Sequence, residues 1–435
     1  MYIIYNLLLV LIFIIYSPIL IYKELTNTNK KNTKELFGFY ANKIKSLATN
    51  NKVIWIHAVS VGETVAASPV VKELKKELPE YKLIFSTTTY TGQNMAHKII
   101  EDADAIVYFP FDLPFAVNKA LNIINPDLIM IIETELWPNF IKIANKRGHK
   151  IIYANGRISD SSYKKYNYLG SIMPDMLNNI DCLAMQSEQD KNRVIELGAN
   201  EKKVFNLGNT KFDQNYSLIS ENKKEKYRKL FKINKDNLVF VAGSTHPDEE
   251  KHLIQIYQEL KKEFPNLYFI VAPRDIERAA EINEIFKTNN IDAVKKTELK
   301  NNNSKKIEAL ILNTIGELAQ IYSIADLVFV GGSMMGKGGH NVLEPAAQGK
   351  LVFFGPDMSN FKDSRDLLIK NDAGIQVNTW QSLKKELNYY LNNKNNLKNR
   401  GEKARKVILN NRGASKRILN HTLKIIKQKS CQHQD

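Results

Sequence analysis

The chain has 435 residues, a formal net charge of +16 and only two cysteines. At roughly 150 residues per domain, this length excludes a single ordinary core and predicts two or three domains, of which two large ones fit best. Cys182 and Cys431 are far apart in the sequence, which argues against a disulfide framework or a paired-cysteine zinc site and favours a reducing compartment. His and Asp residues show no metal-ligand spacing, so we expect neither a catalytic metal nor a cofactor.

Residues 1–22 form an apolar segment without a charged side chain. Its length is about what a helix needs to cross a bilayer. It lacks the basic start and the small-residue cleavage site of a signal peptide, so we expect a retained membrane anchor. Six lysines against two glutamates follow between residues 23 and 45. By the positive-inside rule this flank places the rest of the chain in the cytoplasm, with the N-terminus facing outward unless the segment stops within the leaflet.

The following part of the chain alternates short apolar segments with amphipathic helical patterns, which predicts parallel βαβ units. The expected strands are 53–59, 82–86, 106–109, 128–133, 151–154 and 182–185. A polar segment at 214–228 interrupts this alternation. We interpret it as a linker between a first domain at 23–213 and a second domain at 229–380.

A second series of expected strands follows at 238–242, 267–271, 308–312, 327–330 and 351–354. Together the two series predict an α/β protein with two Rossmann-like, doubly wound domains that face a cleft. Ligands of such sheets bind beyond the carboxyl ends of the strands. We therefore expect the chemistry to occur between the domains.

The C-terminal region from 384 to 435 carries 14 Lys and Arg but 3 Asp and Glu, an excess of 11 positive charges. An anionic membrane lipid surface and a merely solvated helix face explain this excess equally well. No RNA-binding or helix-turn-helix signature accompanies it, so nucleic acid is not an expected partner. The helices expected at 381–435 could pack back on the first domain.

Glu63 lies in the segment HAVSVGET at 57–64, directly after the first expected strand. There it can project into the cleft as a general base, or it can merely cap the following helix, and we favour the base. Ser68 and Pro69 would begin that helix, unless it starts earlier and Pro69 kinks it. Ser60, in the same turn, is a further candidate site residue.

Glu133 and Glu135 end a buried apolar strand. An unpaired carboxylate there costs on the order of several kcal/mol, so at least one of the two is expected to be functional. Arg157 follows the next strand and can bind a carboxylate or phosphate in bidentate fashion, or simply neutralise Glu133. Lys211, in GNTKFD at 208–213, points to the same cleft in this interpretation.

In the second domain, His246 lies in the turn GSTH at 243–246 and is either a site residue or only a hydrogen-bonded linker. Pro273 and Arg274 end the next strand, where Arg274 is a strong candidate for binding phosphate.

Residues 328–356 predict a strand, a glycine-rich turn, a helix and another strand. Six of its glycines, at positions 331, 332, 336, 338, 339 and 349, allow backbone amides to approach a phosphate. The helix is expected at 341–348, with Glu344 placed to accept ribose hydroxyl hydrogens. A plain connection in an α/β sheet is the alternative, but His340 and Asn341 beside the helix start, together with Gly316 and Glu317, favour a nucleotide-sugar pocket.

Many short motifs of this chain, in one order, resemble those of the 3-deoxy-D-manno-octulosonic acid (Kdo) transferases of lipid A biosynthesis. The motifs are HAVSVGE, TTTYTGQ, FPFD, ETELWPN, NGR, GNTKFD, AGSTHPDEE, APR and GGHNVLEPAAQGK, and they run from the apolar segment to about residue 376. The resemblance implies a membrane-associated GT-B enzyme of glycosyltransferase family 30 at the cytoplasmic face of the cell inner membrane. It also implies inverting, metal-independent transfer of Kdo from CMP-Kdo to the lipid A precursor lipid IVA.

By motif position, the resemblance implies a role for each of several residues. Glu63 looks like the proton acceptor, and Glu133 and Lys211 look like the groups that support the transition state. The CMP-binding segments would be Pro273 and Arg274; Ile315, Gly316 and Glu317; and Asn341, Val342, Leu343 and Glu344. The chain departs from the usual family form at 313–315, where an aspartate and a methionine more often precede GEL.

Two points stay open at this stage. Lys211, Arg157 or Lys337 could hold the Kdo carboxylate, and the sequence does not choose among them. A GT-B glycosyltransferase or epimerase that uses a UDP-sugar is the alternative enzyme.

Overall fold

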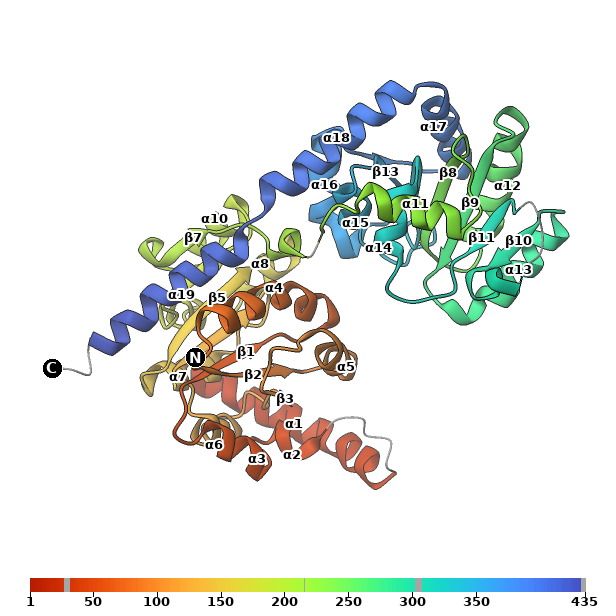
Figure 1. Ribbon diagram of the computed structural model, residues 1–435. Coiled ribbons are helices and arrows are strands. Elements are labelled where there is room, and N and C mark those ends of the chain that lie inside the picture. Colours follow the sequence, from red (N-terminus) through yellow and green to blue (C-terminus); the bar gives the residue numbers. More distant parts are fainter. Residues whose placement is uncertain (27–31, 215, 302–306, 432–435) are drawn as a thin grey trace. The chain divides into compact units, whose positions relative to one another are not determined.

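The computed structural model describes residues 1–26, 32–214, 216–301 and 307–431. The chain forms two compact units: unit 1 comprises Met1–Gln214 with Asn411–Asp435, and unit 2 comprises Asn215–Asn410. Each unit contains a sheet with helices around it (Figure 1). Lys30 and Lys31 of the lysine-rich flank, and residues 432–435 of the basic C-terminal region, lie outside the described residues.

Unit 1 has a seven-stranded sheet in the order β3-β2-β1-β4-β5-β6-β7, and all of its strand pairs are parallel. The strands are β1 (Val53–His57), β2 (Lys82–Thr87), β3 (Ala105–Tyr108), β4 (Leu128–Ile132), β5 (Lys150–Gly156), β6 (Cys182–Met185) and β7 (Val204–Asn206). Every residue of β1 and β4 is buried, which is typical of a parallel sheet covered on both faces.

Helices form two separate cores on the two faces of this sheet. The helices of unit 1 are α1 (Tyr2–Leu25), α2 (Thr33–Leu36), α3 (Asn42–Ala48), α4 (Val61–Glu77), α5 (Tyr90–Ile99), α6 (Pro114–Ile124), α7 (Pro138–Lys146), α8 (Asp160–Asn167), α9 (Ile172–Asn178), α10 (Glu188–Glu196) and α19 (Ala414–Cys431). Because strand side chains alternate between faces, Trp55 packs with α3, α6, α7 and α9. Its neighbours Ile54 and Ile56 pack with α4, α5 and α19.

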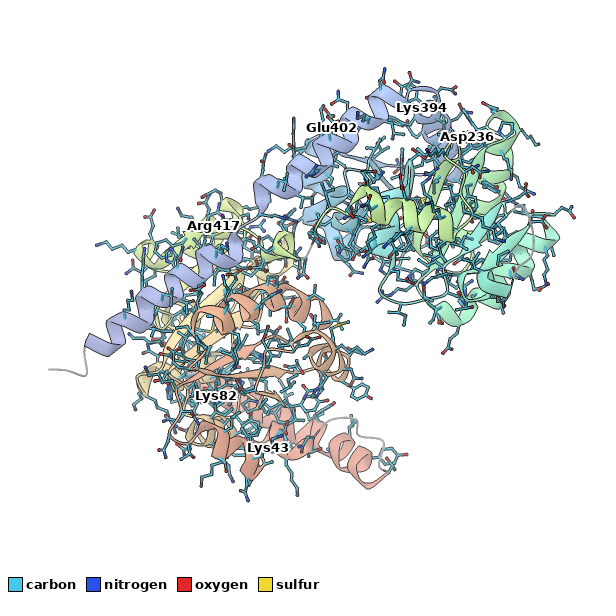
Figure 2. All side chains as sticks on the ribbon, viewed as in Figure 1. Lys43, Lys82, Asp236, Lys394, Glu402 and Arg417 are labelled. Carbon is cyan, nitrogen blue, oxygen red and sulfur yellow. The ribbon has the colours of Figure 1, made fainter. Side chains whose placement is uncertain are left out.

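The helix α19 belongs to unit 1 although it comes last in the chain. Ile418, Leu419 and Ile425 of α19 lie in the core formed with α4 and α5. Arg417 Nε donates to the carbonyl oxygen of Leu207 at 2.8 Å (Figure 2). These contacts join the C-terminal end of the chain to the first sheet.

Unit 2 has a second seven-stranded sheet, in the order β10-β11-β9-β8-β12-β13-β14, and its strand pairs are also parallel. The strands are β8 (Leu238–Thr245), β9 (Leu267–Pro273), β10 (Ala293–Lys295), β11 (Ala309–Ile311), β12 (Leu327–Val330), β13 (Val352–Phe354) and β14 (Gly374–Gln376). The helices are α11 (Glu221–Leu230), α12 (Glu249–Glu263), α13 (Ala279–Thr288), α14 (Leu318–Ile321), α15 (Leu343–Ala347), α16 (Lys362–Lys370), α17 (Trp380–Asn392) and α18 (Lys394–Asn411). Helices α12, α13 and α17 share one core with the sheet.

The two parallel sheets confirm the expected class of two Rossmann-like units. Strands β6 and β12 have the predicted bounds, whereas β7, β10 and β14 were not predicted. Each of these three has only three residues and pairs with its neighbour at the outer part of a sheet. The equally short β11 and β13 are fully buried, whereas each of these three strands has only one buried residue, so its apolar pattern is too weak to be recognised.

The structure differs from the sequence expectations in two places and decides between two alternatives in a third. The segment 214–228, interpreted as a linker, contains most of α11, whose Tyr227 is buried. The helix expected at 341–348 is the five-residue α15. Finally, α4 begins at Val61, the earlier start that the sequence left open, so Ser68 does not cap it and Pro69 lies inside it.

The helix α1 matches the expected apolar segment. Its stretch from Tyr2 to Ile19 has a mean hydropathy of 2.2, and it is the one helix in the described parts of the chain that is long and apolar enough to cross a membrane. The observations that support a membrane-crossing capacity are the length and the apolar composition of α1.

Candidate functional site

The strand order in each sheet reverses at one point, and such a point is where open parallel sheets bind ligands. In unit 1 the reversal lies between β1 and β4, and in unit 2 it lies between β8 and β12. Glu63, Glu133, His246 and His340 follow the carboxyl ends of these strands, and Arg157, Lys211 and Arg274 follow other strands of the same sheets. We describe the two groups separately.

The group in unit 1, here called the acidic cluster, consists of Glu63, Glu133, Thr134 and Glu135. Glu63 lies in the first turn of α4, just after β1, and the other three residues directly follow β4. The side chain of Thr134 donates a hydrogen bond to Glu63 Oε1 at 2.8 Å. This bond joins the turns after the two strands at the reversal point.

Glu63 both caps α4 and carries a carboxylate suited to proton transfer. Its Oε2 accepts hydrogen bonds from the amides of Val59 at 2.6 Å and Ser60 at 3.3 Å, and Ser60 Oγ accepts from the Glu63 amide at 3.4 Å. This reciprocal arrangement is a capping box. The capping alternative considered from the sequence is therefore present, but it occupies only one of the two oxygens.

The surroundings of Glu63 raise its affinity for a proton. The residue is only 6% exposed. The pKa of the carboxyl is raised to about 7: burial raises it most, the charges of Glu135 and Glu133 add to this, and hydrogen bonds from Thr134 and Val59 act in the opposite direction. A carboxylate with a pKa near the working pH is an effective general base.

Glu133 forms an ion pair with Lys211, whose Nζ lies 2.8 Å from Glu133 Oε1. The lysine comes from the short 3₁₀ helix Thr210–Asp213, which follows β7. Asn155 Nδ2 also donates to Glu133 Oε1 at 3.3 Å, and Asn155 Oδ1 accepts from the Thr210 amide at 2.9 Å. Asn155 therefore connects both ends of the ion pair.

The backbone that carries this ion pair is strained. Glu133 and Asn155 have φ values of 60° and 54°, in the left-handed region that non-glycine residues avoid. The Glu133 carbonyl accepts from the Arg157 amide at 3.2 Å, and it also accepts from the hydroxyl of Tyr153. Such conformations persist where surrounding contacts hold them, and they are frequent at functional sites. Arg157 is half-buried beside this backbone, while the carboxylate of Glu133 pairs with Lys211.

The group in unit 2, here called the basic cluster, consists of His246, Arg274, Lys337 and His340. His246 follows β8, Arg274 follows β9, and the other two residues lie in the glycine-rich turn after β12. Burial lowers the pKa of His246; the charge of Glu250 opposes this shift, and the charges of Lys337 and Arg274 add to it. The side chains of Arg274 and Lys337 are exposed. An anionic ligand can therefore reach both.

The two histidines form a pair. Their Nε2 atoms lie 2.8 Å apart, and their ring planes are parallel to within 2° with centroids 5.1 Å apart, so the rings meet edge to edge. One Nε2 must donate and the other must accept, so at most one ring carries a positive charge. Burial lowers the pKa of His340 to about 4, and the charges of Arg274 and His246 act in the same direction. His246 is thus part of a pair and not only a linker.

Glu249 organises the glycine-rich turn. This carboxylate at the start of α12 is fully buried. It accepts hydrogen bonds from the amides of Gly332 at 2.8 Å, Met334 at 3.2 Å and His246 at 3.0 Å. The glycine-rich turn was expected to present its amides to a phosphate, but an internal carboxylate already accepts the amides of Gly332 and Met334. The turn is therefore a built scaffold that presents the basic cluster.

The segment 341–344 divides between polar and apolar positions. Asn341 Nδ2 donates to Glu344 Oε1 at 3.0 Å, and Asn341 Oδ1 accepts from the Leu343 amide at 3.0 Å. Val342 and Leu343 are buried. Burial raises the pKa of Glu344, whereas Asn341 and the charge of Arg274 lower it. The polar pair Asn341 and Glu344 is thus associated with Arg274, while the two apolar residues pack inward.

The remaining predicted residues have different surroundings. Pro273 is the buried last residue of β9. Ile315 is 82% exposed, and Gly316 has a φ of 89° with open space around its Cα. Glu317 pairs with Lys296 and accepts from Thr314 at 2.5 Å; burial alone would raise its pKa, but these two partners lower it below the ordinary value.

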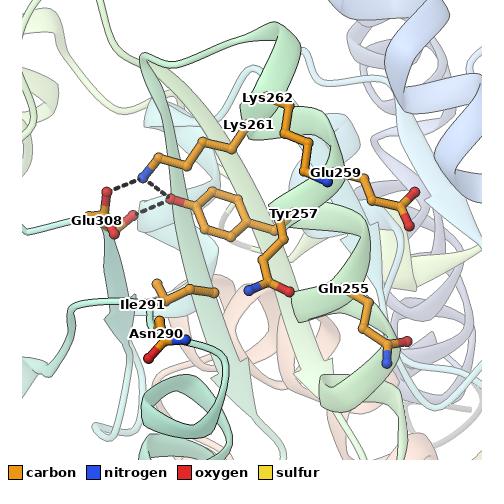
Figure 3. Close-up of a pocket in the computed structure, with 9 residues that line it drawn as sticks. Gln255, Tyr257, Glu259, Lys261, Lys262, Asn290, Ile291 and Glu308 are labelled. Atoms are coloured by element: carbon orange, nitrogen blue, oxygen red, sulfur yellow. Dashed lines mark hydrogen bonds and ion pairs between the residues drawn. The ribbon is translucent and has the colours of Figure 1, made fainter.

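A hollow in unit 2 lies away from these groups. Tyr257, Lys261 and Glu308 line it (Figure 3). Lys261 Nζ lies 2.6 Å from Glu308 Oε1 and donates to the Tyr257 hydroxyl at 2.8 Å. Glu308 precedes β11, so the hollow is at the amino end of a strand. Since its polar groups pair with each other, we assign this ion pair to stability.

Sequence patterns missed the roles of Thr134, Asn155 and Glu249. Asn155 next to a glycine after a strand could have signalled a left-handed residue. The other two act through contacts between distant segments, such as Glu249 with Gly332. No local pattern reports such a contact.

Comparisons with known proteins agree with these two units. A family model described as 3-deoxy-D-manno-octulosonic-acid transferase matches residues 31–214, and one described as glycosyl transferases group 1 matches residues 222–407. A 3-deoxy-D-manno-octulosonic acid transferase from Haemophilus influenzae is 32% identical over 393 residues, which are 90% of this chain and 90% of that protein. A bifunctional glycosyltransferase/methyltransferase from Fusobacterium nucleatum is 36% identical over 394 residues, which are 90% of this chain but 59% of that protein.

Solved structures show the same fold at low sequence identity. A UDP-GlcNAc 2-epimerase from Neisseria meningitidis has a TM-score of 0.59 and 14% identity, with 86% of this chain and all of that chain covered. A glycosyltransferase from Rickettsia africae has a TM-score of 0.53 and 16% identity, with 87% and 98% covered. At these identities the likeness concerns the fold alone.

Proposed function

Because the chain belongs to the 3-deoxy-D-manno-octulosonic acid transferase family and is a glycosyltransferase, we propose that it transfers Kdo from CMP-Kdo to the lipid A precursor lipid IVA. The observation that carries the proposal is the acidic cluster, in which a buried Glu63 with a pKa near 7 lies beside the ion pair of Glu133 and Lys211. A transferase that attacks with a sugar hydroxyl needs such a base.

In this mechanism Glu63 removes the proton from a glucosamine hydroxyl of the acceptor. The oxygen attacks the anomeric carbon of Kdo as the bond to the CMP phosphate breaks on the opposite side. A single displacement of this kind inverts the anomeric configuration. The proton stays on Glu63 and then leaves to water, while CMP carries away the bonding electron pair.

The ion pair of Glu133 and Lys211 would support the transition state. Positive charge develops at the anomeric carbon as the donor bond breaks, and a fixed carboxylate such as Glu133 stabilises that charge. Kdo itself carries a carboxylate, for which Lys211, Arg157 and Lys337 are the candidate partners. The salt bridge at 2.8 Å and the bond from Asn155 hold Glu133 in place before substrate arrives.

The basic cluster would hold the departing CMP. Arg274 is exposed and adds its charge to the site of His340 and Glu344, so it can neutralise the leaving phosphate without a metal ion. Asn341 and Glu344 would bind the ribose, and the backbone at Pro273 and at Ile315, Gly316 and Glu317 would border the nucleotide. Since Asn341 Oδ1 already accepts a hydrogen bond from the amide of Leu343, the first residue of α15, we assign most of the phosphate stabilisation to Arg274 and not to the helix end.

The acceptor would be presented by a membrane. Lipid IVA keeps its acyl chains in a bilayer, and the apolar helix α1 would keep the enzyme at the same surface, which we propose is the cytoplasmic face of the inner membrane. The basic C-terminal region would add attraction to anionic lipid.

One experiment tests donor, acceptor and stoichiometry together. The purified full-length protein is incubated with CMP-Kdo and tetraacylated lipid IVA, and the lipid products are weighed by mass spectrometry. We expect a mass increase equal to one or more Kdo residues. Parallel titrations with CMP and UDP separate this proposal from a UDP-sugar enzyme, because preferential UDP binding would contradict it.

A further inference from the structure

The rest of unit 1 covers the helix α1 along a single stripe of the helix surface. Its half-buried positions are Tyr2, Tyr5, Asn6, Leu9, Phe13 and Ser17. Residues three or four apart lie on one face of a helix, so these positions form one line. At 1.5 Å per residue, the line from Tyr2 to Ser17 is about 22 Å long. Most of the length of α1 therefore runs along the surface of unit 1.

Polar contacts hold the first half of this stripe. The hydroxyl of Tyr5 donates to Asp112 Oδ2 at 2.8 Å, and Asn139 Nδ2 donates to Asn6 Oδ1 at 2.6 Å. Lys142 Nζ lies 3.6 Å from the centre of the Tyr2 ring. Asp112 and Asn139 are buried residues of the unit, not surface side chains. The stripe is therefore docked by specific hydrogen bonds.

Aromatic contacts continue the stripe. The ring of Phe13 lies 5.7 Å from that of Phe37 and 6.3 Å from that of Phe111, both in edge-on geometry. Phe37 in turn stacks on Phe115 at 6.2 Å. Figure 1 shows α1 beside α2 and α3 in this part of unit 1. The docking thus extends from the start of α1 to its second half.

The other faces of α1 are apolar and exposed. The exposed side chains are Ile3, Ile4, Leu7, Leu8, Val10, Leu11, Ile12, Ile14, Ile15 and Ile19. The apolar surface continues onto unit 1 at Phe39 and Phe115, which are 49% and 56% exposed. Lys119 Nζ lies 3.0 Å from the centre of the Phe39 ring. An exposed apolar surface of this size, edged by lysines and aromatic rings, is typical of the boundary between lipid headgroups and acyl chains.

If α1 crossed the bilayer, the part of unit 1 that is docked against it would also have to enter the bilayer. The hydrocarbon core is about 30 Å thick, and the docked stripe covers about 22 Å of α1. The flank of unit 1 that holds Asp112, Asn139 and Lys142 would then lie in hydrocarbon. Buried polar groups with partners tolerate low polarity, but exposed lysines and loop backbone on the same flank do not.

From this docking we propose that α1 lies in the plane of the membrane as a monotopic helix, with its exposed apolar face in the acyl-chain boundary of an anionic bilayer and both of its ends on the side of the catalytic units. The inference rests on the membrane attachment in the proposed function. It differs from the expectation from the sequence, in which the helix crosses the bilayer and the N-terminus lies on the far side.

Labelling of reporter cysteines tests the sidedness. In the full-length protein with Cys182→Ser and Cys431→Ser, one version carries a Gly-Ser-Cys extension before Met1, and a second carries Lys235→Cys on the exposed surface of unit 2. An impermeant maleimide is applied to right-side-out and to inverted inner-membrane vesicles. We expect both reporters to be labelled from the same side. Labelling of the N-terminal reporter only from the opposite side would overturn the inference.

Cross-linking tests the docking in the same membranes. A short bifunctional thiol reagent should join Asn6→Cys and Asn139→Cys within one chain, since the wild-type side chains are hydrogen-bonded. The matched control, Leu7→Cys with Asn139→Cys, moves the thiol to the outward face of α1 and should give at least fivefold less product. Equal yields from the two pairs would overturn the inference. Transfer activity measured on the same vesicles is a separate readout, so a crossing helix with normal activity would leave the proposed function intact.

Discussion

Thr134 donates a hydrogen bond to Glu63 Oε1 at 2.8 Å, and so connects the turn after β4 to the first turn of α4 after β1. These two turns meet where the strand order of the first sheet reverses. The bond leaves Glu63 Oε2 for the helix cap. One carboxylate therefore completes a helix start and also lies in an acidic, buried environment that raises its pKa.

Replacement of Glu63 by Gln should reduce kcat for Kdo transfer by about 10²- to 10⁴-fold, the range that a general base contributes. CMP-Kdo binding, measured by calorimetry, should be unchanged because the donor groups lie in unit 2. The matched control is Glu77→Gln at the other end of the same helix, which should keep full activity. Retention of more than a tenth of the wild-type kcat by E63Q would contradict the assigned role.

The pH dependence of transfer should follow the ionisation of Glu63. The base works only when it is deprotonated, so kcat/KM should rise with pH through about 7. The hydrogen bond from Thr134 lowers the pKa of Glu63, and Thr134→Val should therefore move the rising limb to higher pH. Thr134→Ser keeps the donor and is the control. A limb that stays in place or moves to lower pH in the valine variant would show that another group sets the profile.

Glu63→Gln should also change how stability depends on pH. The folded pKa of Glu63 is raised to about 7 from an ordinary value of 4.5. Its contribution to stability is thus fully present below about pH 4.5 and is lost as the pH rises through 7. Relative to wild type, E63Q should gain on the order of 1–3 kcal/mol in unfolding free energy between pH 5 and pH 8. Denaturant unfolding at both values measures this change, and a relative loss for E63Q would contradict the sign.

Removal of Lys211 should destabilise unit 1 as well as reduce activity. Lys211→Met leaves Glu133 buried without its cation, which costs about 3 kcal/mol for a broken buried pair. The double variant Lys211→Met with Glu133→Gln removes both charges and should recover most of the stability but none of the activity. Chemical denaturation and the transfer assay give the two readouts. Recovery of activity in the double variant would show that the pair has only a structural role.

The glycine-rich turn should tolerate a methyl group at one glycine and not at another. A Cβ at Gly331 would lie 2.6 Å from Glu249 Oε2 and 2.7 Å from the Ser244 carbonyl. Gly331→Ala should therefore displace Glu249 and weaken CMP binding by more than tenfold. Gly336 has open space around it, although its φ is 67°, so Gly336→Ala should weaken binding less. Calorimetric titration with CMP measures both, and a reversed order would contradict the scaffold role of Glu249.

The sequence predicted the strands around both reversal points because long apolar segments followed by polar turns are a strong pattern. Glu63 and Glu133 could be singled out for the same reason, since each follows such a segment, whereas Lys211 follows the three-residue β7 and was singled out by the motif GNTKFD. What the pattern could not provide was the pairing of distant groups. Asn155 is hydrogen-bonded to both Glu133 and Thr210, which are tens of residues away in the sequence. Glu249 accepts a hydrogen bond from the amide of Gly332, in a turn that follows another strand.

The bounds of the short elements could not be predicted from the sequence either. The segment 341–348 has good helix-forming residues, but Asn341 Oδ1 accepts the amide of Leu343, and α15 begins only there and has five residues. Likewise, the capping box of Ser60 and Glu63 starts α4 seven residues before Ser68. In both places a side chain that bonds to nearby backbone decided where the helix begins.

The most direct test of the account is transfer by the wild-type protein and by E63Q, each given CMP-Kdo and lipid IVA in vesicles and followed by mass spectrometry of the lipid. We predict Kdo-bearing product from the wild type and a loss of at least 10²-fold in E63Q, whose CMP-Kdo affinity is unchanged. Equal product from both proteins, or none from a wild type that binds UDP in preference to CMP, would contradict the account.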